Sequence, residues 1–181
     1  PNKTNIYLFK EFKFKVLLLL RNPNEILNSM FFFLEKANNS SDIDSKRVLL
    51  SFYPPLVNNY FSLGFEQKID FLIKNFLVNL IKYFEYWEAV LKDPYFKKNL
   101  LIINYDNLMN NKNTTLTKIL NFFEYNDIDI KKLNLEIRSN NYREKSKENN
   151  WHQTFNYSQK REIKDLLKNS KYYLLNDKVN I

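Results

Sequence analysis

Residues 14–29 read FKVLLLLRNPNEILNS, and this stretch decides the fold. Its first part is a continuous apolar run over residues 15–20, which is typical of a β-strand buried on both faces in a parallel sheet. Asn22 then suits the N-cap of a helix, and Pro23 suits its first position. We therefore predict a buried strand that Arg21 leaves, followed by a helix from Pro23 to about residue 36.

The chain downstream repeats this alternation of strand and helix. Between residues 66 and 92 the apolar side chains recur every 3.6 residues, which predicts a long amphipathic helix. The Asp93-Pro94 pair then ends that helix. Residues 100–104 (LLIIN) form a second short apolar run with β-branched side chains, so they predict a second buried strand.

The C-terminal part of the chain adds two shorter predicted helices. One begins at Thr114 or Thr115 and runs to about residue 123, and the other covers residues 159–168 with Ser158 as its cap. Residues 126–150 are polar and are read mainly as a long loop. The order strand, helix, long helix, strand, helix predicts an α/β fold with a parallel sheet core flanked by helices, in one domain over residues 1–181.

Composition limits the classes of function. The chain has 181 residues, no cysteine, one glycine and a net charge of +8. The lack of cysteine excludes disulfides, thiolate catalysis and cysteine-based zinc sites. The positive charge brings nucleic acid into consideration, but the lysines and arginines are scattered, and no recognisable nucleic-acid-binding motif occurs. Residues 71–84 are interrupted by polar side chains, so they do not predict a membrane span.

The turn between the first predicted strand and helix is a candidate anion site. Ligands of parallel α/β sheets bind beyond the carboxyl ends of the strands, where Arg21 lies. The following helix directs its first N–H groups and its positive dipole end into the same space. Ser29 lies seven residues after Asn22, almost two helical turns at about 100° per residue, and so faces the helix entrance. Geometry alone leaves an equal alternative to the anion site, in which Arg21 forms a structural salt bridge and Ser29 is simply a polar residue of the helix.

Three segments carry a resemblance to a known family. LLLLRNPNEILNSMF resembles the 3′-phosphate motif of sulfotransferases that use 3′-phosphoadenosine 5′-phosphosulfate (PAPS). LLIINYDNLMNNKNTTLTKILNFF resembles the strand, Tyr-Glu-Asp-Leu segment and helix of the same enzymes, with the acidic residue shifted. RSNNYREKSKENNWHQTFNYSQKREI resembles their basic C-terminal loop, tryptophan and helix. The resemblance covers roughly residues 14–170 and implies the P-loop NTPase-like sulfotransferase fold.

The resemblance implies roles for individual residues. Arg21 and Ser29 would bind the 3′-phosphate of the donor. Tyr105 would lie near the adenine or shape its pocket, although a buried tyrosine at a strand end is an equal alternative. The basic loop around Arg143 would close over the phosphate, with Lys145 and Lys147 as competing candidates. That loop lacks the glycine of the family pattern, and a solvated loop is the alternative for all of its basic residues. Trp151 is expected to be a packing anchor.

The sequence departs from the family at its N-terminal end. Nothing in residues 1–20 resembles the loop rich in Gly, Ser and Thr that binds the 5′-phosphosulfate. No catalytic base is recognisable either, because the only histidine, His152, lies far downstream of the expected place. We therefore expect a sulfotransferase domain that is incomplete at its N-terminus, supplies the 3′-phosphate-binding half of the site, and would not turn over alone.

Several functional readings follow from these observations. The first is sulfonate transfer from PAPS, without a metal, to a hydroxyl or amine of a small-molecule, glycan or lipid acceptor. The second is a non-catalytic α/β module that binds a nucleotide or phosphate, and the third is a basic nucleic-acid-binding protein. For the first reading we expect a cytoplasmic protein with no nucleic-acid partner and no transmembrane segment, while an upstream targeting segment and the oligomeric state stay open.

Overall fold

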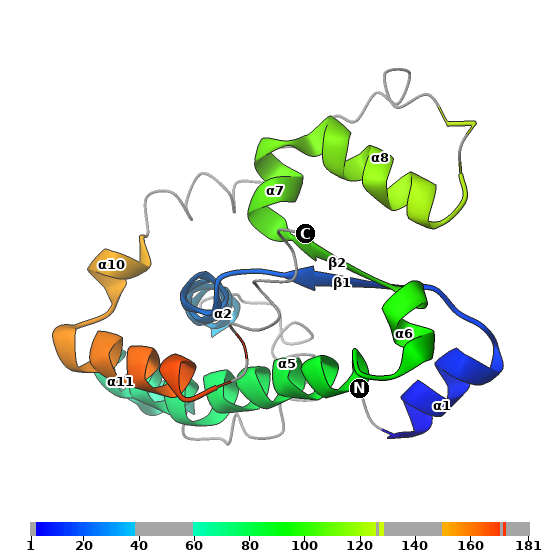
Figure 1. Cartoon of the computed structure of the whole chain (residues 1–181). Helices are drawn as coiled ribbons and strands as arrows, with labels where there is room; N and C mark the ends of the chain where they lie inside the picture. Colours follow the sequence, from blue (N-terminus) through cyan, green and yellow to red (C-terminus); the bar gives the residue numbers. More distant parts are fainter. Residues whose placement is uncertain (1–2, 39–59, 126, 129–149, 171, 173–181) are drawn as a thin grey trace. The chain divides into compact units, whose positions relative to one another are not determined.

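The computed structural model describes residues 3–38, 60–125, 127–128, 150–170 and 172 (Figure 1). The chain divides into two units. The first consists of Pro1–Arg21, Ile81–Arg138 and Ser170–Ile181, and the second of Asn22–Leu80 and Ser139–Asn169. The boundaries therefore fall directly after Arg21 and inside one helix, and each unit is built around its own set of buried side chains.

The first unit contains a parallel pair of strands. These are β1 (Val16–Leu20) and β2 (Leu100–Asn104), and the register pairs Val16 with Leu100 and Leu20 with Asn104. Both strand predictions are confirmed, as is the parallel sheet flanked by helices. The helices of this unit are α1 (Lys3–Glu11), most of α5 (Val78–Val90), α6 (Pro94–Asn99), α7 (Tyr105–Asn110) and α8 (Lys112–Phe122).

Strand β1 is buried on one face only, so the prediction of a strand buried on both faces is wrong. Leu18 and Leu20 are buried, whereas Leu17 and Leu19 are 39% and 43% exposed. Alternate side chains of a strand point to opposite faces, and a run of identical leucines carries no signal that distinguishes those faces. The buried face contributes to a core that also includes Phe84, Trp87, Val90, Phe96, Leu100 and Ile102.

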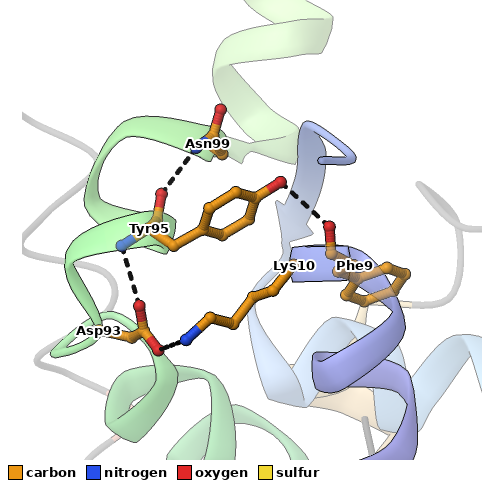
Figure 2. A network of polar contacts seen from close by, with 5 residues as sticks. All are labelled: Phe9, Lys10, Asp93, Tyr95 and Asn99. Atoms are coloured by element: carbon orange, nitrogen blue, oxygen red, sulfur yellow. Dashed lines mark hydrogen bonds and ion pairs between the residues drawn. The ribbon is translucent and has the colours of Figure 1, made fainter. Parts of the chain in front are cut away.

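A polar clip holds α1 to the start of α6 (Figure 2). The Asp93 side chain caps α6 by accepting a 2.9 Å hydrogen bond from the Tyr95 N–H, and its other oxygen lies 2.6 Å from Lys10 Nζ. The Tyr95 hydroxyl reaches the carbonyl oxygens of Phe9 and Phe14, at 3.0 and 2.8 Å. Asp93-Pro94 is therefore the start of a new helix as well as the end of the region predicted to be helical.

The clip predicts a pH-dependent stability. The hydrogen bond from Lys10, helped by that from the Tyr95 N–H, lowers the pKa of Asp93 below its ordinary value of 3.8. A carboxyl whose pKa is lowered by folding stabilises the folded state above its unfolded pKa, and this contribution disappears as the pH falls through the folded pKa. We expect Asp93→Asn, which keeps a good capping side chain, to lower the thermal midpoint at pH 7. The difference from wild type should vanish as the pH falls below 3.8, measured by circular dichroism.

The partner side chain provides the matched control. Lys10→Gln removes the same ion pair from its other end, so its thermal midpoint should show the same dependence on pH. A difference between Asp93→Asn and wild type that stays constant from pH 7 to pH 2 would contradict the ionic origin of the effect.

The second unit is helical in the part of the chain that the structure describes. Its elements are α2 (Pro23–Asn38), a 3₁₀ turn η1 (Tyr60–Ser62), α4 (Phe65–Leu72), a π-helical turn η2 (Ile73–Leu77), α10 (Trp151–Thr154) and α11 (Tyr157–Lys168). The predicted helix from Pro23 is confirmed and ends at Asn38, two residues later than expected. Leu27, Phe31 and Leu34 line its buried side.

The long amphipathic helix predicted over residues 66–92 is helical from Phe65 to Val90, but it is not regular. The turn η2 widens it over Ile73–Leu77. Asn75 lies in this turn and donates its side-chain amide to the Phe71 carbonyl at 2.9 Å. Such side-chain bonds compete with the helical ladder, and π turns are local insertions that a 3.6-residue period does not reveal.

Helix α11 begins earlier than predicted, and its cap is Asn156 instead of Ser158. Asn156 accepts a 2.9 Å bond from the Gln159 N–H, and the Gln159 side chain bonds back to the Asn156 N–H at 3.0 Å. This reciprocal capping box satisfies two N–H groups at once. Gln159 is 2% exposed and also donates to Glu66 and Asp70 of α4, so the cap ties α11 to α4.

A buried polar cluster links α2, η1 and α4. Lys68 Nζ lies 2.8 and 3.0 Å from the two carboxylate oxygens of Glu35, and 6.0 Å from the centre of the Tyr60 ring. Tyr60 is 1% exposed, and its burial together with the nearby Glu35 charge raises the pKa of its hydroxyl. The phenol therefore stays protonated at physiological pH.

Candidate nucleotide-phosphate site

The carboxyl ends of β1 and β2 bring Arg21 and Tyr105 together. The register that pairs Leu20 with Asn104 places the next residue of each strand side by side. The guanidinium carbon of Arg21 lies 4.7 Å from the centre of the Tyr105 ring. This is a cation–π contact, with the guanidinium over the tyrosine ring.

Tyr105 is placed by the cap of a helix that the sequence did not predict. Asn104, the last residue of β2, accepts a 2.7 Å hydrogen bond from the Asp106 N–H and caps α7. Tyr105 is therefore the first residue of that helix, directly at the strand end. Tyr105 therefore lies at a strand end, as predicted. Its side chain is half-buried, and its predicted contact with adenine stays a prediction.

The backbone of Arg21 has a partner from a remote part of the sequence. The Tyr172 hydroxyl donates a 2.8 Å hydrogen bond to the Arg21 carbonyl oxygen. Tyr172 is 5% exposed, and its ring packs against Phe84 with the centroids 5.2 Å apart. Sequence reasoning gave Tyr172 no role, because a contact across 151 positions leaves no local pattern.

The second unit begins at Asn22, where the start of a helix was predicted. Asn22 Oδ1 accepts a 3.0 Å hydrogen bond from the Asn24 N–H, and Pro23 is the first residue of α2. The N–H groups of Glu25 and Ile26 bond to the Asn22 carbonyl at 3.0 Å. The N-cap and the proline at the first position are thus confirmed.

The remaining predicted site residues are distributed differently. Ser29 is an exposed residue of α2 in the second unit, whereas Arg21 belongs to the first, so the convergence of these two side chains stays a prediction. Arg143 and Lys145 lie outside the described residues, as does Lys147.

The tryptophan and histidine of the C-terminal segment lie next to each other on α10. The rings of Trp151 and His152 are tilted by 30° with their centroids 3.6 Å apart. Trp151 also lies 6.3 Å from the ring of Phe155, which is buried. The packing role expected for Trp151 agrees with this contact. His152 is exposed on this short helix.

The comparisons with known proteins bear on this arrangement. The model of the sulfotransferase domain family matches residues 6–176. The chain belongs to the sulfotransferase domain family. Its members transfer sulfonate groups, so sulfonate transfer in general is the chemistry of this fold. Comparison with curated proteins and with solved structures finds no match to the chain.

Among the described residues of this sulfotransferase-family chain, no group of three His, Asp or Glu side chains is arranged to hold a metal ion. None of the helices within the described ranges is both long and apolar enough to cross a membrane.

Proposed function

We propose that this chain is a PAPS-dependent sulfotransferase polypeptide and that it supplies the 3′-phosphate-binding half of the donor site. The stacked pair of Arg21 and Tyr105 at the carboxyl ends of β1 and β2 carries this proposal. Ligands of parallel α/β sheets bind at this end of the strands. A guanidinium fork matches two phosphate oxygens, which makes Arg21 suited to a phosphate monoester.

The other predicted residues have supporting roles in the proposal. The cation–π contact with Tyr105 restricts the guanidinium, so the fork loses less conformational freedom when the phosphate binds. The Ser29 hydroxyl contributes a further donor, and the positive dipole end of α2 favours an anion. Arg143 and Lys145 close over the same phosphate.

The donor supplies the sulfonate group, which an acceptor hydroxyl or amine receives while adenosine 3′,5′-bisphosphate is released. The residues of this proposal bind the part of the donor that is released as adenosine 3′,5′-bisphosphate. Other groups act on the sulfonate that is transferred. The only glycine, Gly64, precedes α4, and residues 3–11 form α1, so a glycine-rich phosphosulfate loop has no counterpart there. The proposal includes a small-molecule, glycan or lipid acceptor and a cytoplasmic location.

Calorimetry with two nucleotides tests the proposal. We expect the chain to bind adenosine 3′,5′-bisphosphate at least about tenfold more tightly than adenosine 5′-monophosphate, because a phosphate held by charge-assisted bonds adds more than about 1.4 kcal/mol. Equal affinities, or no binding of the bisphosphate, would overturn it.

The alternative functions give different results in the same series. A non-catalytic module would bind the bisphosphate but transfer no sulfonate from PAPS to any acceptor, even in a full-length chain that supplies a 5′-phosphosulfate loop. A nucleic-acid-binding protein would bind DNA or RNA with an affinity that falls steeply with salt, and would not distinguish the two nucleotides.

A further inference from the structure

The Tyr172 side chain forms a hydrogen bond to the backbone of Arg21, from which it is remote in the sequence. The paired part of β1 ends at Leu20, so Arg21 lies just beyond the sheet register. At that point the Tyr172 hydroxyl donates to the Arg21 carbonyl at 2.8 Å. Every residue of this contact belongs to the first unit.

The tyrosine ring is itself held in place. Tyr172 is 5% exposed, and its ring lies against Phe84 of α5, a residue that is 3% exposed. A buried hydroxyl needs a partner, because an unmade hydrogen bond in the interior costs free energy. The Arg21 carbonyl is such a partner, so the bond is well placed to persist in the folded state.

Two tyrosines thus act on different parts of Arg21. The centre of the Tyr105 ring lies 4.7 Å from the guanidinium carbon, and Tyr172 bonds to the carbonyl at the other end of the residue. A side chain projects from its backbone, so a fixed peptide group and a supported guanidinium restrict the direction of the whole residue. Restricting a group before binding reduces the entropy that its ligand must otherwise offset.

From this geometry we propose that Tyr172 is a positioning residue for the 3′-phosphate of the donor, acting through Arg21. The inference rests on the proposed function, because it assigns Tyr172 to the same phosphate. Tyr172 does not touch the phosphate in this account; its hydroxyl holds the backbone from which the phosphate-binding fork extends.

The test is Tyr172→Phe, which keeps the ring against Phe84 and removes only the donor. We expect calorimetry to show a five- to tenfold weaker affinity for adenosine 3′,5′-bisphosphate, on the order of one lost hydrogen bond. The affinity for adenosine 5′-monophosphate, which has no 3′-phosphate, should not change. The ratio of the two affinities is the readout, because a smaller folded fraction lowers both equally.

Tyr95→Phe is the matched control. It deletes a tyrosine hydroxyl that also bonds to backbone carbonyls in the first unit, those of Phe9 and Phe14, but not to Arg21. We expect it to leave the ratio of affinities at the wild-type value. In an Arg21→Ala background, Tyr172→Phe should likewise have no further effect on the bisphosphate.

The outcomes separate the two proposals. If wild type prefers the bisphosphate through Arg21 but Tyr172→Phe keeps the wild-type ratio, the inference is overturned and the proposed function stands. An equal loss of both ligands, or an undiminished effect of Tyr172→Phe without Arg21, also overturns the inference alone. If wild type shows no preference, or Arg21→Ala keeps it, the proposed function fails and the inference fails with it.

Discussion

Arg21→Ala is expected to weaken the binding of adenosine 3′,5′-bisphosphate by about 2 kcal/mol or more, roughly thirtyfold, because it removes a fork of charge-assisted bonds to the 3′-phosphate. The measurement is calorimetry at fixed salt, with adenosine 5′-monophosphate titrated in parallel. Arg21→Lys should fall between wild type and alanine, since lysine keeps the charge but neither the fork nor the flat face over Tyr105.

The chain offers a charge-matched control for this variant. Arg161 is an exposed residue of α11 that lies 4.0 Å from the carboxylate of Asp165. Arg161→Ala changes the net charge of +8 by the same amount as Arg21→Ala. If it weakened the bisphosphate equally, the loss would reflect general attraction to a basic protein, and Arg21 would not be the phosphate ligand.

The place of the candidate site could be predicted from the sequence, because the two strands that end at this site are two short apolar runs. Residues 15–20 and 100–104 are strongly typical of buried strands, and two such strands separated by helices favour parallel pairing. Parallel pairing in turn implies that Arg21 and Tyr105, which follow the two runs, share one edge of the sheet. The contact between their side chains is a property of the register, which the sequence does not specify.

Other features had no local signal that could reveal them. Helix α1 buries none of its residues, so no apolar period marks it. Helix α7 spans only Tyr105–Asn110, which is too short for periodicity to be read. Asn156 and Ser158 are both good caps, and the reciprocal bonds with Gln159 decide between them. The bond from Tyr172 to Arg21 is a tertiary contact, and such a contact leaves no pattern in the local sequence. The site could therefore be only partly predicted.

The second large effect is expected for the core beneath β2. Phe96 is 0% exposed and precedes the strand by four positions, and its ring lies edge-on to Trp87 at 6.4 Å. Phe96→Ala removes this ring and leaves a cavity, so we expect the free energy of unfolding to fall by about 3–5 kcal/mol. Stabilities of folded proteins are about 5–15 kcal/mol, so this loss is a large share of the total.

Urea unfolding measures this effect most directly through Trp87 fluorescence. The chain has two tryptophans, Trp87 and Trp151, one in each unit, so a Trp151→Phe background reports on the first unit alone. Phe12→Ala is the matched control, since it deletes the same ring from a position that is 62% exposed, and it should cost less than about 1 kcal/mol. Equal losses in the two variants would show that Phe96 is not a core residue of this unit. A large loss confined to Phe96→Ala would mean that the stability of the unit that contains β1, β2, Arg21 and Tyr105 depends on this buried ring.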